Sequence, residues 1–419
     1  MMRSPAVPDW ETELQRWLAP FLSCLGHKAR ERWFPIYLRG QLSATGRRCA
    51  TTMAREMVPE DEEQLHHFVS TSPWDGAPLE AELVRAVNAL VGGPGAFLII
   101  DDTALAKKGT ESVGVARQYC GELGKNANCQ SLVSLTLARG EVPVPIALRL
   151  FLPLSWDRDE RRREKCGVPQ GIRHRPKWKI ALEELDRVMA SGARFREVLT
   201  DAGYGSCGEF RQGLSDRRLR WTVGILPTQQ VYPADVTLRV PAPSGKGRPP
   251  KRPVPSERSV SARRMIESLG PQAFRRIRWR EGTKGALQAR FAVVRVRVAE
   301  GARRQGGKRD PGEAVWLIAE ERDNGERKYY LSNHPVSTSR QKLAASVKSR
   351  WSCEQAHQQM KQELGLNHYE GRSWTGLHHH CLLTLIAYAF LQHLRLRGKK
   401  NSPGASRLHT PPCRRSGAD

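Results

Sequence analysis

The chain has 419 residues, of which 39% are hydrophobic, and this is enough apolar material to fill the cores of two or three domains. Lys and Arg number 68 against 43 Asp and Glu, so the formal net charge is +25. This surplus favours a polyanionic partner, and nucleic acid is favoured over a membrane because no apolar run approaches the roughly 18 to 20 residues that span a bilayer. The nine cysteines are scattered without a CxxC pair, which argues against a disulfide framework or a zinc finger and favours the cytoplasm.

Residues 1–95 have the periodicity of a helical domain. Apolar residues recur at helical spacing from Trp10 to Leu22, and two short periodic segments, 48–57 and 60–69, are separated by Val58-Pro59. The pair of short segments is typical of a helix-turn-helix, but any compact helical bundle gives the same pattern. We predict a DNA-binding domain here, with a plain bundle as the alternative.

Residues 96–226 alternate between strand and helix patterns. Five apolar residues, 96–100, run directly into Asp101 and Asp102, which predicts a strand buried on both faces. The elements that follow are a β-hairpin, two helices and two strands, predicted at 131–138 with 142–152, at 179–191 and 208–214, and at 197–201 and 221–226. This order predicts an α/β domain around a mixed five-stranded sheet whose first strands are antiparallel.

The second half of the chain begins with a loss of apolar character. We interpret 227–311 as an insertion that has a small β part and a basic loop rich in Pro and Gly. Residues 312–397 return to the core, with one long helix predicted from Ser339 to Gln362 and a buried helix from Cys381 to Leu394. The basic tail, 398–419, is predicted to be disordered.

Three acids lie at positions where chemistry is expected. Asp101 and Asp201 each end a predicted strand, and Glu354 lies on the helix predicted at 339–362. Neighbouring strand ends would bring the two aspartates together, and a helix packed across that edge would add the glutamate. Three carboxylates suit Mg²⁺ or Mn²⁺, and a pair of such ions can activate a water or a 3′-hydroxyl for phosphodiester chemistry.

Two cations share the helix face of Glu354. Arg350 precedes it by four residues and Lys361 follows it by seven, so both point the same way and are suited to hold phosphates. The alternative is that Arg350 and Glu354 form an ordinary surface pair. Four cations near the acids are further candidates for the DNA path, with a solvated loop as the alternative: Lys107, Lys108, Arg117 and Lys125. Tyr204 is suited either to stack on a base or to pack in the core.

These motifs resemble those of bacterial insertion-sequence transposases of the DDE class, in the group related to IS4 and most closely the IS701 family. Arg350, Glu354 and Lys361 match the spacing of the Arg, Glu and Lys in that group's Tyr-Arg-Glu-Lys signature, whereas Val347 stands in place of its Tyr. The segment 101–103 resembles the first Asp-x-Thr motif and 201–205 the second. The resemblance extends over roughly residues 25 to 395.

The resemblance implies an RNase H-like core in which Asp101, Asp201 and Glu354 are catalytic and hold two Mg²⁺ or Mn²⁺ ions. The Asp-x-Thr order favours Asp101 as the ligand and leaves Asp102 as a supporting acid. It also implies cut-and-paste transposition at terminal inverted repeats and into target DNA, carried out by a synaptic homodimer in the bacterial nucleoid.

Two other functions stay open from the sequence. One is a catalytically inactive or domesticated transposase that only binds DNA, for which Val347 is the best argument. The other is a different RNase H-like endonuclease, such as a resolvase. A metal site at the three histidines 378–380 is not expected, because consecutive residues on a helix point in different directions.

Overall fold

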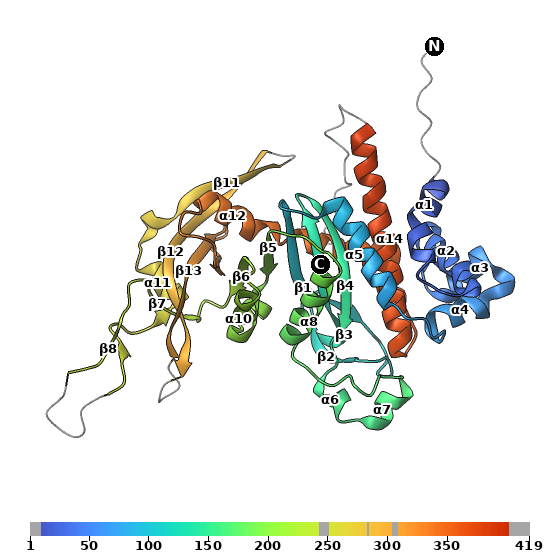
Figure 1. Ribbon diagram of the computed structural model, residues 1–419, viewed down its shortest axis with the longest axis horizontal. Coiled ribbons are helices and arrows are strands. Elements are labelled where there is room, and N and C mark those ends of the chain that lie inside the picture. Colours follow the sequence, from blue (N-terminus) through green and yellow to red (C-terminus); the bar gives the residue numbers. More distant parts are fainter. Residues whose placement is uncertain (1–9, 243–250, 283–284, 304–308, 402–419) are drawn as a thin grey trace, which may run out of the picture.

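The computed structural model describes residues 10–242, 251–282, 285–303 and 309–401 (Figure 1). Part of the predicted basic loop and nearly all of the predicted tail, 402–419, lie outside the described residues. Within the described ranges, no helix is long and apolar enough to cross a membrane.

The N-terminal region is a bundle of short helices that packs around the last helix of the chain. Figure 1 shows the blue helices beside the long red helix α14. Leu14, Leu18 and Phe21 recur on one face of the first helix and are buried, as the helical period requires. The helices are α1 (Trp10–Leu22), α2 (Lys28–Ser43), α3 (Ala50–Met57), α4 (Glu62–Ser70), α5 (Ala77–Val91) and α14 (Trp374–Asn401), with a 3₁₀ turn at Pro59–Asp61.

The three consecutive histidines of α14 face three different sets of partners inside this bundle. His378 bonds to the carbonyl of Trp374, His379 to the carbonyls of Val69 and Trp74, and His380 to the hydroxyl of Tyr37. The run therefore ties α14 to the N-terminal helices.

Five strands in the middle of the chain lie side by side in the order β4, β3, β1, β5, β6. The last three are parallel to one another, while β3 is antiparallel to both β1 and β4. The bounds are β1 (Ala96–Ala106), β3 (Lys125–Arg139), β4 (Val142–Leu150), β5 (Glu197–Thr200) and β6 (Trp221–Ile225), and β2 (Ala116–Cys120) pairs with the first part of β3. The predicted mixed α/β architecture is confirmed.

The sheet is larger than the five strands expected from the sequence. Strand β14 pairs with β6, so that the insertion continues the same sheet, which has twelve strands within the described residues. The domain boundary predicted at residue 311 falls inside β13. This strand begins at Arg309 and pairs with β12 in a long antiparallel hairpin. The strands are β7 (Gln230–Pro233), β10 (Val260–Ser261), β11 (Arg275–Gly282), β12 (Gly285–Arg303), β13 (Arg309–Glu321) and β14 (Arg327–Ser332), while β8 (Leu238–Arg239) and β9 (Val254–Pro255) form a small separate sheet.

Helices cover both faces of the five central strands. Cys353 of α13 packs against Phe97 and Ile99 of β1 on one face, and α8 packs against β3 and β4 on the other. The remaining helices are α6 (Leu154–Asp157), α7 (Glu160–Lys165), α8 (Lys177–Ala190), α9 (Ala202–Gly205), α10 (Gly208–Asp216), α11 (Ala262–Glu267), α12 (Arg340–Ser349) and α13 (Ser352–Leu364), with 3₁₀ turns at Pro271–Ala273 and Leu366–His368.

The single long helix predicted at 339–362 is two helices, α12 and α13, and that part of the prediction is wrong. The break lies at Arg350 and Trp351, where the backbone bonds tighten: the N–H of Cys353 bonds to the carbonyl of Arg350 at 3.3 Å and that of Glu354 to Trp351 at 3.2 Å. These are 3₁₀-type bonds, and such a turn inside a helix changes the direction of the residues around it. Helical periodicity continues through the break, so the sequence pattern does not reveal it.

Candidate active site

Two of the three predicted acids are neighbours because of strand register. β1 and β5 are parallel, and Ile100 lies opposite Thr200, the last residue of β5, so Asp101 and Asp201 are the next residues along the two chains. The prediction that Asp101 ends its strand is wrong, because β1 continues to Ala106 through its pairing with β3. At Asp201 the chain turns into α9, and its Oδ1 accepts the N–H groups of Gly203 at 3.0 Å and Tyr204 at 3.3 Å. A Cβ on Gly205 would lie 2.1 Å from the carbonyl oxygen of Gly224, so the close approach of this turn to β6 requires glycine.

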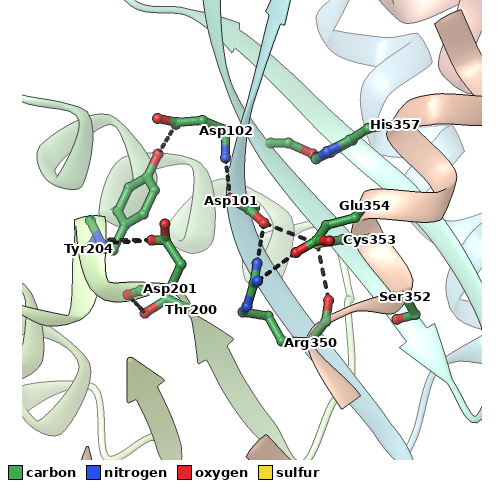
Figure 2. Close-up of polar contacts among 12 residues, drawn as sticks. Asp101, Asp102, Thr200, Asp201, Tyr204, Arg350, Ser352, Cys353, Glu354 and His357 are labelled. Carbon is green, nitrogen blue, oxygen red and sulfur yellow. Dashed lines mark hydrogen bonds and ion pairs between the residues drawn. The ribbon is translucent and has the colours of Figure 1, made fainter. Parts of the chain in front are cut away.

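The third acid comes from α13 and is joined to the first by an arginine. Arg350 places Nη1 2.5 Å from Oδ2 of Asp101 and Nη2 2.6 Å from Oε1 of Glu354 (Figure 2). The thiol of Cys353 donates to the same oxygen of Asp101, with Sγ 3.3 Å away. The Glu354 side chain is 58% exposed, whereas that of Asp101 is 14% exposed. The tight turn at the start of α13 thus presents Arg350, Cys353 and Glu354 to the middle of β1, where Asp101 lies.

The surroundings of Asp101 raise the pKa of its carboxyl group. The pKa of Asp101 is raised to about 6, chiefly by burial and to a smaller extent by the charges of Asp201 and Asp102, while Arg350 opposes the shift. A carboxyl with a pKa shifted upward by burial and by neighbouring acids is one that a bound cation would stabilise in its ionised form. The electrostatics of the site therefore favour a cation beside Asp101.

The donor chemistry fits a divalent metal ion, although the side chains do not form a closed metal site. Within the described residues no group of three or more His, Cys, Asp or Glu side chains is placed to hold an ion. Asp101 and Asp201 are adjacent hard oxygen donors, which suit Mg²⁺ or Mn²⁺. Glu354 is engaged by Arg350 and would have to leave that ion pair to add a third oxygen.

Asp102 lies on the opposite face of β1 and has different partners. Its Oδ1 accepts a hydrogen bond from the hydroxyl of Tyr204 at 2.5 Å, and its Oδ2 accepts one from Nζ of Lys177 at 2.5 Å. Strand alternation sends successive side chains to opposite faces, and only the face of Asp101 meets α13. The structure thus separates two acids that apolar patterning left equivalent.

Sequence reasoning missed a buried hydrogen bond next to Asp101. Ser134 lies directly opposite Asp101 in the β1–β3 ladder, and its hydroxyl is 2.8 Å from Nε2 of His357, one turn beyond Glu354 on α13. Burial lowers the pKa of His357 to about 3, so the imidazole is neutral. The bond fixes α13 to β3 beside the site. A histidine three residues after Glu354 on an apolar helix face is the only sequence signal for it.

The predicted DNA contacts have mixed placements. Lys108, Arg117 and Lys125 are exposed. Lys107 donates to the carbonyl of Tyr369 at 2.5 Å, and burial lowers its pKa, so in this structure it anchors a loop.

The remaining candidates lie closer to the core. Lys361 is 3.1 Å from Oε2 of Glu122, and its side chain is 12% exposed. Tyr204 is buried, and its hydroxyl donates to Asp102. In this structure Tyr204 therefore packs in the core, the alternative that the sequence left open beside stacking on a base. Val347, which stands where the family signature has Tyr, is buried against Ile277 and Phe291 of the insertion. The surroundings of this position are therefore apolar.

The comparisons with known proteins agree with this geometry. The family model of the DDE superfamily endonucleases matches residues 20–286, well over half of the chain, and the protein belongs to this family. A probable transposase for insertion sequence element IS701 from Microchaete diplosiphon is 30% identical over 186 residues, covering 42% of this chain and 46% of the relative. The match therefore spans less than half of that relative. Together, the family model and this relative confirm the resemblance to IS701-like DDE transposases that the motifs indicated.

The family match ends at residue 286, before the third acid. Asp101 and Asp201 lie inside the matched range and Glu354 lies outside it. The assignment of Glu354 therefore depends on the spacing from Arg350 to Lys361 and on the ion pairs that bring α13 to β1.

Proposed function

We propose that this protein is a DNA transposase that binds the terminal inverted repeats of an insertion sequence, hydrolyses the phosphodiester bond at each end and joins the freed 3′-hydroxyls to target DNA. The observation that carries the proposal is that Arg350 joins Glu354 to Asp101, beside which strand register brings Asp201, in a member of the DDE superfamily. We include the order β4, β3, β1, β5, β6 in the proposal as the RNase H-like core.

Each side chain has a defined part in this proposal. Asp101 and Asp201, and Glu354 once freed from Arg350, would hold two divalent ions, which supply activation of the attacking oxygen and stabilisation of the leaving oxygen. Arg350 exchanges its carboxylate partners for phosphate oxygens as DNA enters, and its planar fork suits both. Lys361 adds a point charge on the same face of α13.

The surroundings of the site support DNA as the substrate. The exposed Lys108 follows β1, and the exposed Arg117 and Lys125 lie on the β2–β3 hairpin that extends from the same sheet, so we assign these three cations to the path of the DNA. The formal net charge of +25 gives the whole molecule the attraction for a polyanion that a duplex requires. We assign the pair α3 and α4 to DNA end recognition and the active assembly to a synaptic homodimer.

The test separates chemistry from binding. Asp201→Ala and Glu354→Ala should abolish Mg²⁺-dependent nicking of DNA that carries the cognate ends, while the affinity for that DNA persists. Glu363→Ala is the matched control, because Glu363 is exposed on the opposite side of α13. Retained nicking in either acid variant overturns the proposal, and a loss of binding would make these acids structural.

A second candidate is a DNA-binding protein without nuclease activity. The observation that favours it is that Arg350 already pairs with both Asp101 and Glu354, so the two acids have a partner without a metal ion. Calorimetric titration with Mn²⁺ distinguishes the two, since the enzyme should bind the ion and should lose that binding in Asp201→Ala. A binding protein has no reason to take up the ion at all.

A further inference from the structure

The turn between β2 and β3 carries two apolar side chains that are open to solvent. Tyr119 is 66% exposed and Leu123 is 48% exposed. The turn is closed by the N–H of Leu123 on the carbonyl of Cys120 at 3.0 Å, and Gly124 takes a positive φ of 62° before β3 begins at Lys125. Scattered exposed apolar residues are ordinary on a protein surface, but these two lie on one hairpin tip of otherwise polar composition.

Cations surround this tip. Arg117 lies two residues before Tyr119 and points to the same face of β2, because side chains alternate along a strand. Tyr119 lies opposite the exposed Asn126, and Lys125 at the start of β3 is exposed as well. An apolar tip bordered by Arg and Lys is complementary to a nucleic acid, whose bases are apolar on their faces and whose backbone is anionic.

The tip is also joined to the helix that carries Glu354. Glu122, in the middle of the turn, pairs with Lys361 at 3.1 Å. Lys361 follows Glu354 by seven residues, a rise of about 10 Å along the helix axis. The ion pair therefore connects the tip to the face of α13 that carries Glu354, while strand register sets the tip apart from the carboxylates, since Tyr119 faces Asn126, eight residues along β3 from the Ser134 that faces Asp101.

We propose that the hairpin tip 119–125 is a wedge that presses Tyr119, assisted by Leu123, against the bases of the bound DNA end at a distance from the bond at the carboxylates. Arg117 and Lys125 hold the phosphates on either side of the contact. The inference rests on the proposed function and deepens it by assigning an element that unstacks bases within the bound DNA end. Such a surface could instead bind a second copy of this chain, and the test below distinguishes that outcome.

The experiment uses the full chain and a duplex taken from the DNA flanking the gene, with 2-aminopurine at successive positions near the expected cut. Tyr119→Ala should weaken binding about tenfold, in line with the loss of one aromatic contact with a base, and should abolish the rise in 2-aminopurine fluorescence that the parent chain gives at the wedge position. Tyr119→Phe keeps the ring and should remain within about twofold of the parent chain in the same assay.

Two further variants separate stacking from charge and from general surface effects. Arg117→Gln should weaken binding to all duplexes alike and reduce the slope of log affinity against log salt by about one, with the fluorescence signal retained. Val336→Ser is the control for loss of an exposed apolar side chain, since Val336 is 73% exposed in a loop outside the hairpin. It should change neither quantity.

The outcomes that overturn the wedge differ from those that overturn the transposase assignment. If the parent chain binds and nicks the duplex, and Tyr119→Ala does so with equal affinity and fluorescence, the wedge is overturned and the proposed function stands. If Tyr119→Ala changes only the mass of the particle in solution, the tip is an interface between copies and the wedge is again overturned. If the parent chain neither binds nor nicks any duplex, the proposed function is overturned and the wedge with it.

Discussion

The two faces of β1 give two adjacent aspartates opposite roles. On one face Asp101 meets Arg350, Cys353 and the end of α13, and the charges there are incompletely balanced. On the other face Asp102 accepts one hydrogen bond from Tyr204 and one from Lys177, so both its oxygens have partners. One step along a strand thus separates a face arranged for chemistry from a face arranged to hold the strand in place.

Replacing the aspartate on each face of β1 with asparagine is the strongest test of this difference between the two faces. Asp101→Asn should reduce nicking by about 10³-fold or more, because it removes a charge that a metal ion and the developing transition state require. Asp102→Asn should cost only about 10- to 100-fold, the range seen when a residue that orients a metal ligand is altered. Single-turnover nicking rates measure both. Equal losses would mean that the two faces are not distinct in function.

Removal of the arginine tests what holds the Asp101 face together. Arg350→Gln should lower the nicking rate by about 10²-fold, because both the phosphate contact and the link from α13 to β1 are lost. Arg350→Lys should restore little of this, since a single ammonium cannot make the two parallel contacts. The measurement is the nicking rate at saturating DNA. Full activity of the lysine variant would show that charge alone is required.

Acid should weaken the Asp101 face through His357. The pKa of this buried imidazole is lowered to about 3, so the unfolded chain binds a proton that the folded chain excludes. Its contribution to stability is complete above the ordinary histidine pKa near 6.5 and is lost as the pH falls toward 3, by at most about 1.4 kcal/mol per pH unit.

Urea unfolding between pH 7 and pH 4 measures this contribution. His357→Gln should flatten the dependence of the free energy of unfolding on pH, and His67→Gln, at an exposed position on α4, should leave it unchanged. An unaltered slope in His357→Gln would place the acid sensitivity of the protein elsewhere.

The smallest expected effect belongs to the Asp102 face. Tyr204→Phe removes a hydroxyl that donates to a carboxylate in a mostly buried setting, so the free energy of unfolding should fall by about 1 to 2 kcal/mol. The nicking rate of the folded variant should fall by less than about tenfold, because the ring still fills its place in the core. A larger loss of rate with unchanged stability would move Tyr204 from support to function.

Short-range patterns predicted much of this molecule well. The helix near 179–191 and the strands ending at Asp201 and near Leu226 occur within a few residues of the predicted positions, because apolar period and turn residues act locally. The strand that begins at Ala96 was predicted too short, because its pairing with β3 carries it past the two aspartates to Ala106. The break at Arg350 was not predicted, since helical period passes through it. The Ser134 to His357 contact was not predicted either, because it joins residues 223 positions apart.

The sequence by itself determined the acids, the place of Asp201 at a strand end, the spacing from Arg350 to Lys361 and the surplus of positive charge. Only the tertiary structure decided which of Asp101 and Asp102 faces α13, which cations stay exposed and how the insertion extends the central sheet. The reason is that strand alternation guarantees opposite faces to neighbouring residues, whereas the elements that cover each face come from distant parts of the chain. Those elements are placed by packing, and packing carries no local sequence signal.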